Sequence, residues 1–347
     1  MLQPLNSIYF TLYSRNVEIL GYSVTESIKG EHFMVKGAAP TIGIALGSGA
    51  AKGWAHIGVL NGLAAMGIKP DKVAGCSVGA LVGAAYAHDH LPELEEWVRS
   101  FSSWDVLGLM DIRWRKGGLI GGEKVFDVLQ SRIGDVMIEQ LNRPFAAVAT
   151  DLYSGQEIWF RHGDLRQAVR ASCSMPGILA PVRQGDRWLV DGAVVNPVPV
   201  SVSRAMGVDI VIAVDLNGYH SGRLQVLPVN MISQKVTEES DLSPRQETGF
   251  MDLFARGREY VSSLTDKFSL GTKSNPGMIA VMSQSMGILE QRHKRARLMG
   301  DPPDICIVPE VANIGTMEFH RADEAIAAGE AAVAKVAHLI EAAIWKD

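Results

Sequence analysis

The chain has 347 residues, 47% of them hydrophobic and 20% charged, and a formal net charge of −5. This balance excludes the strongly basic surface of a nucleic-acid-binding domain, so no nucleic acid partner is expected. The three cysteines are widely spaced without a CxxC pair, which argues against a disulfide framework and a zinc site. No apolar run approaches the ~20 residues that span a bilayer, and residues 1–30 lack the pattern of a signal peptide. We therefore expect a cytoplasmic protein whose only membrane contact is peripheral, at the inner membrane surface.

Short apolar runs alternate with helical patterns, which is typical of an α/β protein with a mostly parallel sheet. The predicted strands cover residues 41–46, 72–74, 145–150, 157–160, 188–190, 209–216 and 305–308. The predicted helices cover residues 54–66, 78–87, 92–101, 123–133, 165–171, 249–270, 275–299 and 321–345.

Composition divides the chain into four parts. Residues 1–40 show no clear period, and either form a flexible extension or precede a true translation start near Met34. Residues 41–216 carry the α/β pattern. Residues 217–248 are rich in Ser, Gln, Glu and Pro and are predicted to be a mobile insertion, either a lid or a linker. Residues 249–347 form a helical C-terminal region.

The first motif with chemical meaning is Gly75-Cys76-Ser77-Val78-Gly79, between a strand and a helix. G-x-S-x-G in this setting is typical of a nucleophile elbow, where small neighbours such as Gly75 and Gly79 allow a strained turn to expose the serine hydroxyl. The alternative is a glycine-rich turn in which Ser77 caps the helix.

The second motif is Gly47-Ser48-Gly49-Ala50-Ala51-Lys52-Gly53, between the strand 41–46 and the helix 54–66. Small residues let backbone N–H groups converge on an anion, which in an acyl hydrolase is the tetrahedral oxyanion. The alternative is a dinucleotide-binding loop with Asp71 as its acidic residue. The spacing opposes that alternative, because the third glycine would fall at Lys52.

The third motif, Asp191-Gly192-Ala193, follows the strand 188–190. An aspartate at a strand end, followed by the small Gly192 and Ala193, can approach another loop and accept a hydroxyl proton. An ordinary Asp-Gly turn is the alternative.

In this order, the three motifs resemble the patatin-like phospholipase family, closest to the bacterial neuropathy-target-esterase-like (NTE) branch. The segments 52–60, 149–152 and 170–177 agree with it, and the resemblance covers about residues 41–216. It implies a patatin-like three-layer α/β/α sandwich with a mostly parallel central sheet, followed here by the helical C-terminal region.

The resemblance also implies a Ser–Asp dyad without a catalytic histidine, metal or other cofactor. Ser77 is then the nucleophile and Asp191 its base, and the substrate is a lipid ester such as a phospholipid or lysophospholipid. The oxyanion donors are backbone groups of Ser48, Gly49 and Ala50. The family's G-x-G-x-x-G aligns with Ser48, Ala50 and Gly53, so two of its glycines are replaced here and the loop tolerates positive φ less well.

Two further residues receive roles from the resemblance. Lys52 occupies the family's basic position and either anchors the loop or is a solvated charge. Asp151 either supports the site from behind or caps a turn. The oligomeric state is left open.

Other arrangements compete with the dyad. A Ser-His-Asp triad would need His220 or His320, and Cys76 could offer a thiol nucleophile. His56 is expected to be a packed or capping residue. The basic residues 292–297 either bind anionic headgroups or form a solvated helix face. At the level of function, the alternatives are a non-catalytic regulatory or scaffold protein and a nucleotide-binding oxidoreductase.

Overall fold

The structure is a computed structural model that describes residues 39–102, 118–120, 126–127, 134–218 and 278–345. The predicted helix 249–270 lies outside these residues. The predicted helix 123–133, the extension 1–40 and the insertion 217–248 lie almost entirely outside them.

The central sheet has eight strands in the order β10-β9-β1-β2-β4-β8-β7, and β5 pairs with β4. Its strands are β1 (Ile42–Leu46), β2 (Lys72–Cys76), β4 (Phe145–Asp151), β5 (Glu157–Phe160), β7 (Val182–Gln184), β8 (Arg187–Asp191), β9 (Ile210–Val214) and β10 (Ile305–Ile307). The pairs from β10 to β4 are parallel, and β5, β8 and β7 pair antiparallel. The mostly parallel sheet is therefore confirmed, with an antiparallel end that was predicted only for β5. A separate parallel pair joins β3 (Gly118–Ile120) to β6 (Gly177–Leu179).

Six of the predicted helices are confirmed to within a few residues at each end. The α-helices are α1 (Ala55–Ala65), α2 (Val78–Ala87), α3 (Leu91–Arg99), α6 (Leu165–Ser172), α7 (Val200–Ala205), α9 (Met278–Gly300) and α10 (Ala322–Ile344). Short 3₁₀ helices cover η1 (Ala50–Trp54), η2 (Ile138–Gln140) and η3 (Gly192–Val194). The six-residue α7 was not predicted.

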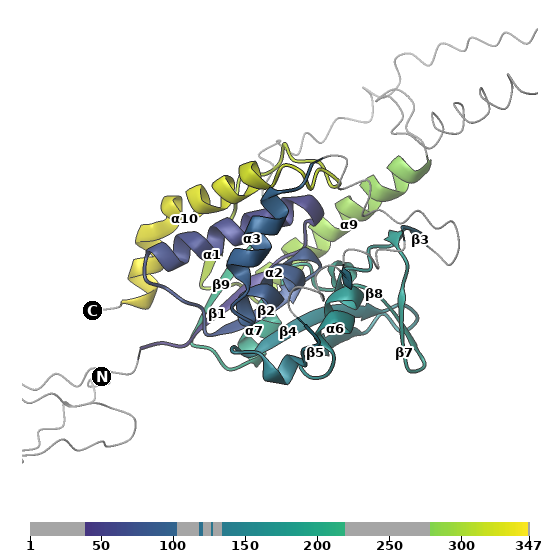
Figure 1. The fold of residues 1–347 in the computed structure, drawn as a ribbon, viewed down its shortest axis with the longest axis horizontal. Helices are drawn as coiled ribbons and strands as arrows, with labels where there is room; N and C mark the ends of the chain where they lie inside the picture. The colour runs from purple at the N-terminus through teal and green to yellow at the C-terminus, as the bar shows by residue number, and fades with distance from the viewer. Residues whose placement is uncertain (1–38, 103–117, 121–125, 128–133, 219–277, 346–347) are drawn as a thin grey trace, which may run out of the picture.

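The sheet is covered on both faces because its strands alternate two kinds of buried side chain. In β1, Ile42, Ile44 and Leu46 point into the main core with α1, α2, α3, α6 and α10. Ala45 points the other way, into a smaller cluster with Val200 of α7 and Leu298 of α9. Side chains that leave a strand on alternate faces need apolar cover on both, which gives the three layers seen in Figure 1.

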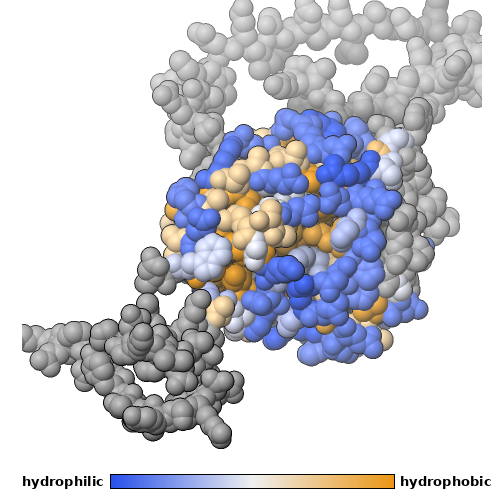
Figure 2. Space-filling model, turned by 60° about the vertical axis from the view of Figure 1, so that its left-hand side comes forward, coloured by the Kyte–Doolittle hydropathy of each residue, from blue (hydrophilic) through white to orange (hydrophobic). Residues whose placement is uncertain are grey.

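The C-terminal region is built onto the same body. β10 pairs with β9 and extends the sheet, and α10 packs along α1. Figure 2 brings forward the side where α10 ends, and hydrophobic residues gather there among hydrophilic ones. The exposed apolar residues there include Leu339 of α10 and Trp345, the residue that follows it. Among the described helices, none is both long and apolar enough to cross a bilayer.

Candidate active site

The site forms where β2 and β8 meet end to end along one edge of β4. Cys76 of β2 is in register with Val148 of β4, and Asp191 of β8 is in register with the next residue, Ala149. β5 occupies the other edge of β4 over the same residues. Since a strand has only two edges, β2 and β8 share the remaining one and approach it from opposite directions. Their carboxyl ends therefore face each other, and these ends carry Ser77 and Asp191.

Ser77 occupies a strained turn between β2 and α2. Its φ is 56° and its ψ −126°, a region that side chains rarely adopt and that costs about 1–3 kcal/mol. Its N–H donates to Ser172 Oγ at 2.9 Å, and its Oγ donates to Asp191 Oδ2 at 2.7 Å. The turn therefore aims the hydroxyl at the carboxylate instead of capping α2, whose first turn receives no side-chain bond.

The small residues of the motifs permit this close approach. A Cβ at Gly79 would lie 2.2 Å from the carbonyl oxygen of Leu46, and one at Gly75 would lie 2.5 Å from Gly79 O. A Cβ at Gly192 would lie 2.3 Å from Val148 O. Such contacts are too short for any side chain, so these glycines let β1, β2 and the loop after β8 converge.

Asp191 is buried, and its carboxylate accepts only two hydrogen bonds in the described part of the chain. Ser77 donates to Oδ2, and the N–H of Ala193 donates to Oδ1 at 2.8 Å. Burial raises the pKa of Asp191 from 3.8 to about 7, the two hydrogen bonds oppose that rise, and the charge of Glu290 adds to it. A carboxylate with a pKa near neutrality is suited to taking a proton from a hydroxyl and returning it.

Thr150 and Ser174 hold the backbone of Asp191. Thr150 Oγ1 donates to the Asp191 carbonyl oxygen at 2.8 Å, and the Asp191 N–H donates to Ser174 O at 2.9 Å. Neither residue, nor Ser172, was predicted as part of the site. The segment 170–177 was noted only for its resemblance to the family.

The loop between β1 and η1 lies beside this pair, and most of its N–H groups are already used. Gly47 N donates to Val214 O, Ser48 N to Pro197 O, and Lys52 N to Gly49 O. Within the described residues, Gly49 and Ala50 have N–H groups without a hydrogen-bond acceptor. The set of oxyanion donors that the resemblance implied therefore narrows to these two, because the Ser48 N–H is occupied.

Position 50 holds an alanine where the family pattern has a glycine, and this difference affects the backbone. Ala50 has a φ of 49°, in the left-handed region that favours glycine. Gly49 packs against Leu216, and Gly53 packs against Val78, the residue after Ser77. The loop is thereby held against the start of α2, with a strained residue where a glycine would fit without strain.

Two further hydrogen bonds connect the segment 47–53 to residues outside it. The buried His56 has its Nε2 at 2.7 Å from the Gly47 carbonyl oxygen, so Nε2 carries the proton and donates. Burial lowers the pKa of His56 to about 4, which keeps the ring neutral. Ala51 N donates to Thr316 O at 3.2 Å. His56 is thus a packed residue, as expected, and it also supports the loop.

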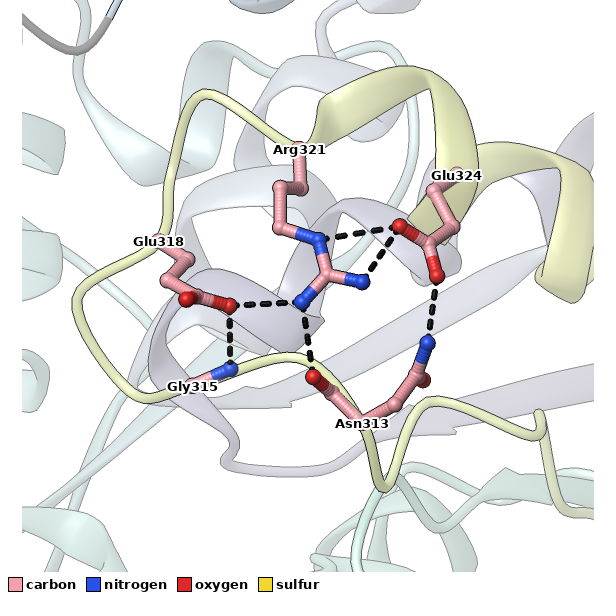
Figure 3. A network of polar contacts seen from close by, with 5 residues as sticks. All are labelled: Asn313, Gly315, Glu318, Arg321 and Glu324. Atoms are coloured by element: carbon pink, nitrogen blue, oxygen red, sulfur yellow. Dashed lines mark hydrogen bonds and ion pairs between the residues drawn. The ribbon is translucent and has the colours of Figure 1, made fainter.

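The segment that contains Thr316 is stabilised by hydrogen bonds of Arg321, as Figure 3 shows. The Arg321 guanidinium donates to Glu318 and Glu324 and to the carbonyl oxygen of Asn313. Glu318 in turn accepts from the N–H of Gly315 at 2.8 Å. The same segment accepts a hydrogen bond from Trp54 Nε1 at Phe319 O, at 3.1 Å. The C-terminal region therefore buttresses η1, which follows the loop.

Two of the basic residues of α9, Lys294 and Arg297, form ion pairs within the protein. Lys294 is buried and lies 2.7 Å from Asp215, and it also donates to Asn217 O. Arg297 pairs with Glu157 at 3.2 Å. For these two side chains the expectation of a solvated face is wrong, because they attach α9 to the ends of β9 and β5. Arg292 is exposed, and headgroup binding by this segment stays a prediction.

Lys52 and Asp151 lie near the site without touching its reacting pair in the described structure. Lys52 Nζ donates to Asn217 Oδ1 at 3.0 Å, and burial lowers the pKa of Lys52. This contact matches the anchoring role. Asp151 Oδ1 accepts from the N–H of Tyr153 at 3.1 Å, so the carboxylate caps the turn between β4 and β5.

The geometry also disfavours two alternatives to the dyad, a Ser-His-Asp triad and a thiol nucleophile. Ser77 and Asp191 are in direct contact, which leaves no room for an imidazole between them, and His320 is exposed on the loop before α10. His220 lies outside the described residues. The thiol of Cys76 is buried, and this burial raises its pKa well above its usual range, which disfavours a thiolate nucleophile.

The dinucleotide alternative fails on the position of Asp71. This residue precedes β2, at the amino end of the strand, and its carboxylate accepts from Ile42 N at 2.7 Å. The glycine loop lies at the opposite, carboxyl edge of the sheet. In a dinucleotide-binding unit both features serve one ligand at the carboxyl edge, so the two cannot act together here.

Comparison with known proteins shows the family of the chain. A family model described as patatin-like phospholipase matches residues 44–203. An uncharacterized NTE family protein of Mycobacterium tuberculosis is 32% identical over 330 residues, covering 85% of this chain and 90% of that protein. The neuropathy target esterase sws of Drosophila melanogaster is 32% identical over 183 residues, covering 51% of this chain and 13% of that protein. Among solved structures, VipD from Legionella pneumophila matches with a TM-score of 0.41 and 12% identity, covering 93% of this chain and 71% of that one.

The fold and the motifs define a protein of the patatin-like phospholipase class. Within that class, the chain belongs to the NTE family. This membership supports hydrolysis of lipid esters in general.

Proposed function

We propose that the chain is a serine acyl hydrolase that cleaves carboxylic esters of lipids through Ser77 and Asp191, without a metal or organic cofactor. The substrate class is a phospholipid or lysophospholipid. The observation that carries the proposal is the 2.7 Å hydrogen bond from Ser77 Oγ to Asp191 Oδ2, made at a strained turn beside two unoccupied N–H groups.

In the first half-reaction, Ser77 Oγ attacks the ester carbonyl carbon and its proton passes to Asp191 Oδ2. The carbonyl oxygen becomes an oxyanion, which the N–H groups of Gly49 and Ala50 stabilise together with the N-terminus of α2. The carbon–oxygen bond to the leaving alcohol then breaks, and Asp191 returns the proton to that oxygen. The acyl group remains on Ser77.

In the second half-reaction, water replaces the alcohol. Asp191 takes a proton from the water as its oxygen attacks the acyl carbon, and a second oxyanion occupies the same loop. Collapse of this intermediate releases the fatty acid and returns the proton to Ser77 Oγ. One carboxylate therefore serves as base and acid in both halves.

Peripheral contact with a lipid surface, at the cytoplasmic side of the membrane, belongs to the same proposal. Its support is the position of three exposed apolar side chains, Leu152, Tyr153 and Trp188, at the carboxyl end of β4. Leu152 N donates to Trp188 O at 2.8 Å, so these residues are neighbours at the sheet edge that carries Ser77. Tyrosine and tryptophan favour the boundary between water and lipid. Replacing Tyr153 and Trp188 with serine should reduce vesicle binding and leave hydrolysis of a short-chain ester intact.

The direct test of the chemistry is labelling with a fluorophosphonate probe, followed by assays on a short-chain ester and a lysophospholipid. We expect Ser77→Ala to abolish labelling and both Ser77→Ala and Asp191→Asn to abolish hydrolysis. Ser154→Ala removes an exposed hydroxyl in the turn after β4 and serves as the matched control that keeps both activities. A folded wild type that is neither labelled nor active would support the non-catalytic scaffold alternative instead.

A further inference from the structure

Helix α9 crosses the carboxyl edge of the sheet and touches both loops of the proposed site. Glu290 meets the loop after β1 through Ser48, and His293 Nε2 lies 2.5 Å from the carbonyl oxygen of Val195, in the loop that follows Asp191. Lys294, one turn after Glu290, forms the buried ion pair with Asp215. The helix is therefore anchored at the point where Glu290 reaches the loop.

Ser48 is held at both its backbone and its side chain. Its N–H donates to Pro197 O at 2.8 Å, and its Oγ donates to Glu290 Oε1 at 2.5 Å. The residue is buried, whereas Gly49 and Ala50, which follow it, are partly open. The Ser48 hydroxyl is thus the last side-chain anchor before the two N–H groups without acceptors.

The carboxylate of Glu290 is partly buried and lies near both positively and negatively charged side chains. Burial raises the pKa of Glu290, and the hydrogen bond from Ser48 and the positive charges of Lys294 and Lys52 oppose that rise. Asp215 also faces this group and is itself paired with Lys294. Burying part of a carboxylate costs free energy unless the group is hydrogen-bonded. The contact with Ser48 is the only side-chain hydrogen bond of Glu290 in the described structure.

We infer that Glu290 is a positioning residue for the oxyanion loop, acting through the Ser48 hydroxyl. The carboxylate fixes Ser48, and Ser48 fixes the orientation in which the N–H groups of Gly49 and Ala50 point toward the carbonyl oxygen of the ester that Ser77 attacks. This inference rests on the proposed function. It makes a residue of the C-terminal region, 242 positions along the chain from Ser48, part of the catalytic geometry.

The test is a double-mutant cycle between Glu290 and Ser48, read on the short-chain ester. Because oxyanion donors act mainly in the transition state, Glu290→Ala should lower kcat by about tenfold or more and leave KM nearly unchanged. Ser48→Ala should do the same, and the double variant should lose no more than either single one. Glu290→Gln keeps an oxygen that accepts from Ser48 and should retain most of the activity.

A second readout is independent of turnover. Hydrogen–deuterium exchange over residues 47–53 should become faster in Glu290→Ala and in Ser48→Ala, to a similar extent. Arg292→Ala, on the exposed side of the same helix, is the matched control and should change neither kcat nor exchange.

The outcomes separate the inference from the proposed function. If the wild type is active and Glu290→Ala keeps full kcat, the inference is overturned but the proposed function stands. The same holds if the losses of kcat in Glu290→Ala and Ser48→Ala multiply in the double variant. Unchanged exchange over the loop would do so as well. An inert wild type would refute the proposed function and, with it, the role of Glu290.

Discussion

The carboxylate of Asp191 should destabilise the folded protein at the pH where the chemistry needs it charged. The side chain is buried, and only Ser77 and Ala193 donate to it in the described structure. Replacing it with asparagine removes the charge and preserves the shape. The amide oxygen of the asparagine can still accept from Ala193 N, and its NH₂ group can donate to Ser77 Oγ. We therefore expect Asp191→Asn to be inactive and, at alkaline pH, more stable than the wild type.

The magnitude follows from the pKa. A rise from 3.8 in the unfolded chain to about 7 in the folded one corresponds to about 4 kcal/mol, at ~1.36 kcal/mol per pH unit. Because the folded-state pKa is the higher one, proton binding to Asp191 stabilises the folded protein, and this stabilisation is fully present below about pH 4. The stabilisation is lost as the pH rises through about 7. Between about pH 5 and about pH 8.5, the wild type should lose roughly 3 kcal/mol relative to Asp191→Asn.

The assay is urea unfolding of both proteins at these two pH values. Taking the difference between them cancels the titration of all other groups. Asp186→Asn, which makes the same substitution at an exposed turn position, is the matched control. If the stability difference between wild type and Asp191→Asn stays constant with pH, Asp191 is not held with a raised pKa, and its assignment as a near-neutral base fails. The same pKa predicts that kcat/KM for the short-chain ester rises with pH and levels off above about 7.

Three further substitutions, the first with a matched control on α9, test the packing around the site. Gly79→Ala places a Cβ 2.2 Å from Leu46 O and should abolish labelling by the fluorophosphonate probe, whereas Gly287→Ala, in open space on α9, should be neutral or stabilising in thermal unfolding. Ala50→Gly should relieve the positive φ and raise the free energy of unfolding by about 0.5–1 kcal/mol, and a loss of stability would show that this residue is not strained. Lys294→Met leaves the buried Asp215 carboxylate unpaired and should cost about 3–5 kcal/mol in urea unfolding, and a change below about 1 kcal/mol would contradict the buried ion pair.

The parts of the fold that could be predicted are those in which local pattern and topology agree. The buried strand β9 and the helix α2 were predicted because each is a continuous apolar run with small or turn-forming neighbours. The pair β4 and β5 was predicted from the turn at Tyr153-Ser154-Gly155. β7 is only three residues long and mostly exposed, so it carries no apolar signal. β7 was missed for that reason.

The supporting residues of the candidate site could not be predicted, because their partners are remote in sequence. Glu290 reaches Ser48 across 242 positions, and Lys294 reaches Asp215 across 79. A charged residue on a helix gives the same sequence signal whether it faces water or a buried partner. Only the docking of α9 on the carboxyl edge of the sheet distinguishes the two.

The meeting of β2 and β8 gives a structural basis for the proposed two-residue mechanism. Two strands that approach along the same edge of β4 bring their carboxyl ends together without an intervening layer, so the acid contacts the nucleophile directly. A histidine between them would require the strands to end further apart. Because the pair is buried, the carboxylate gains the basicity that an exposed aspartate lacks, and this basicity is what a histidine otherwise supplies. Burial of Asp191 is therefore the single cause of two properties: the lower stability of the protein expected above neutral pH and the raised basicity of this carboxylate.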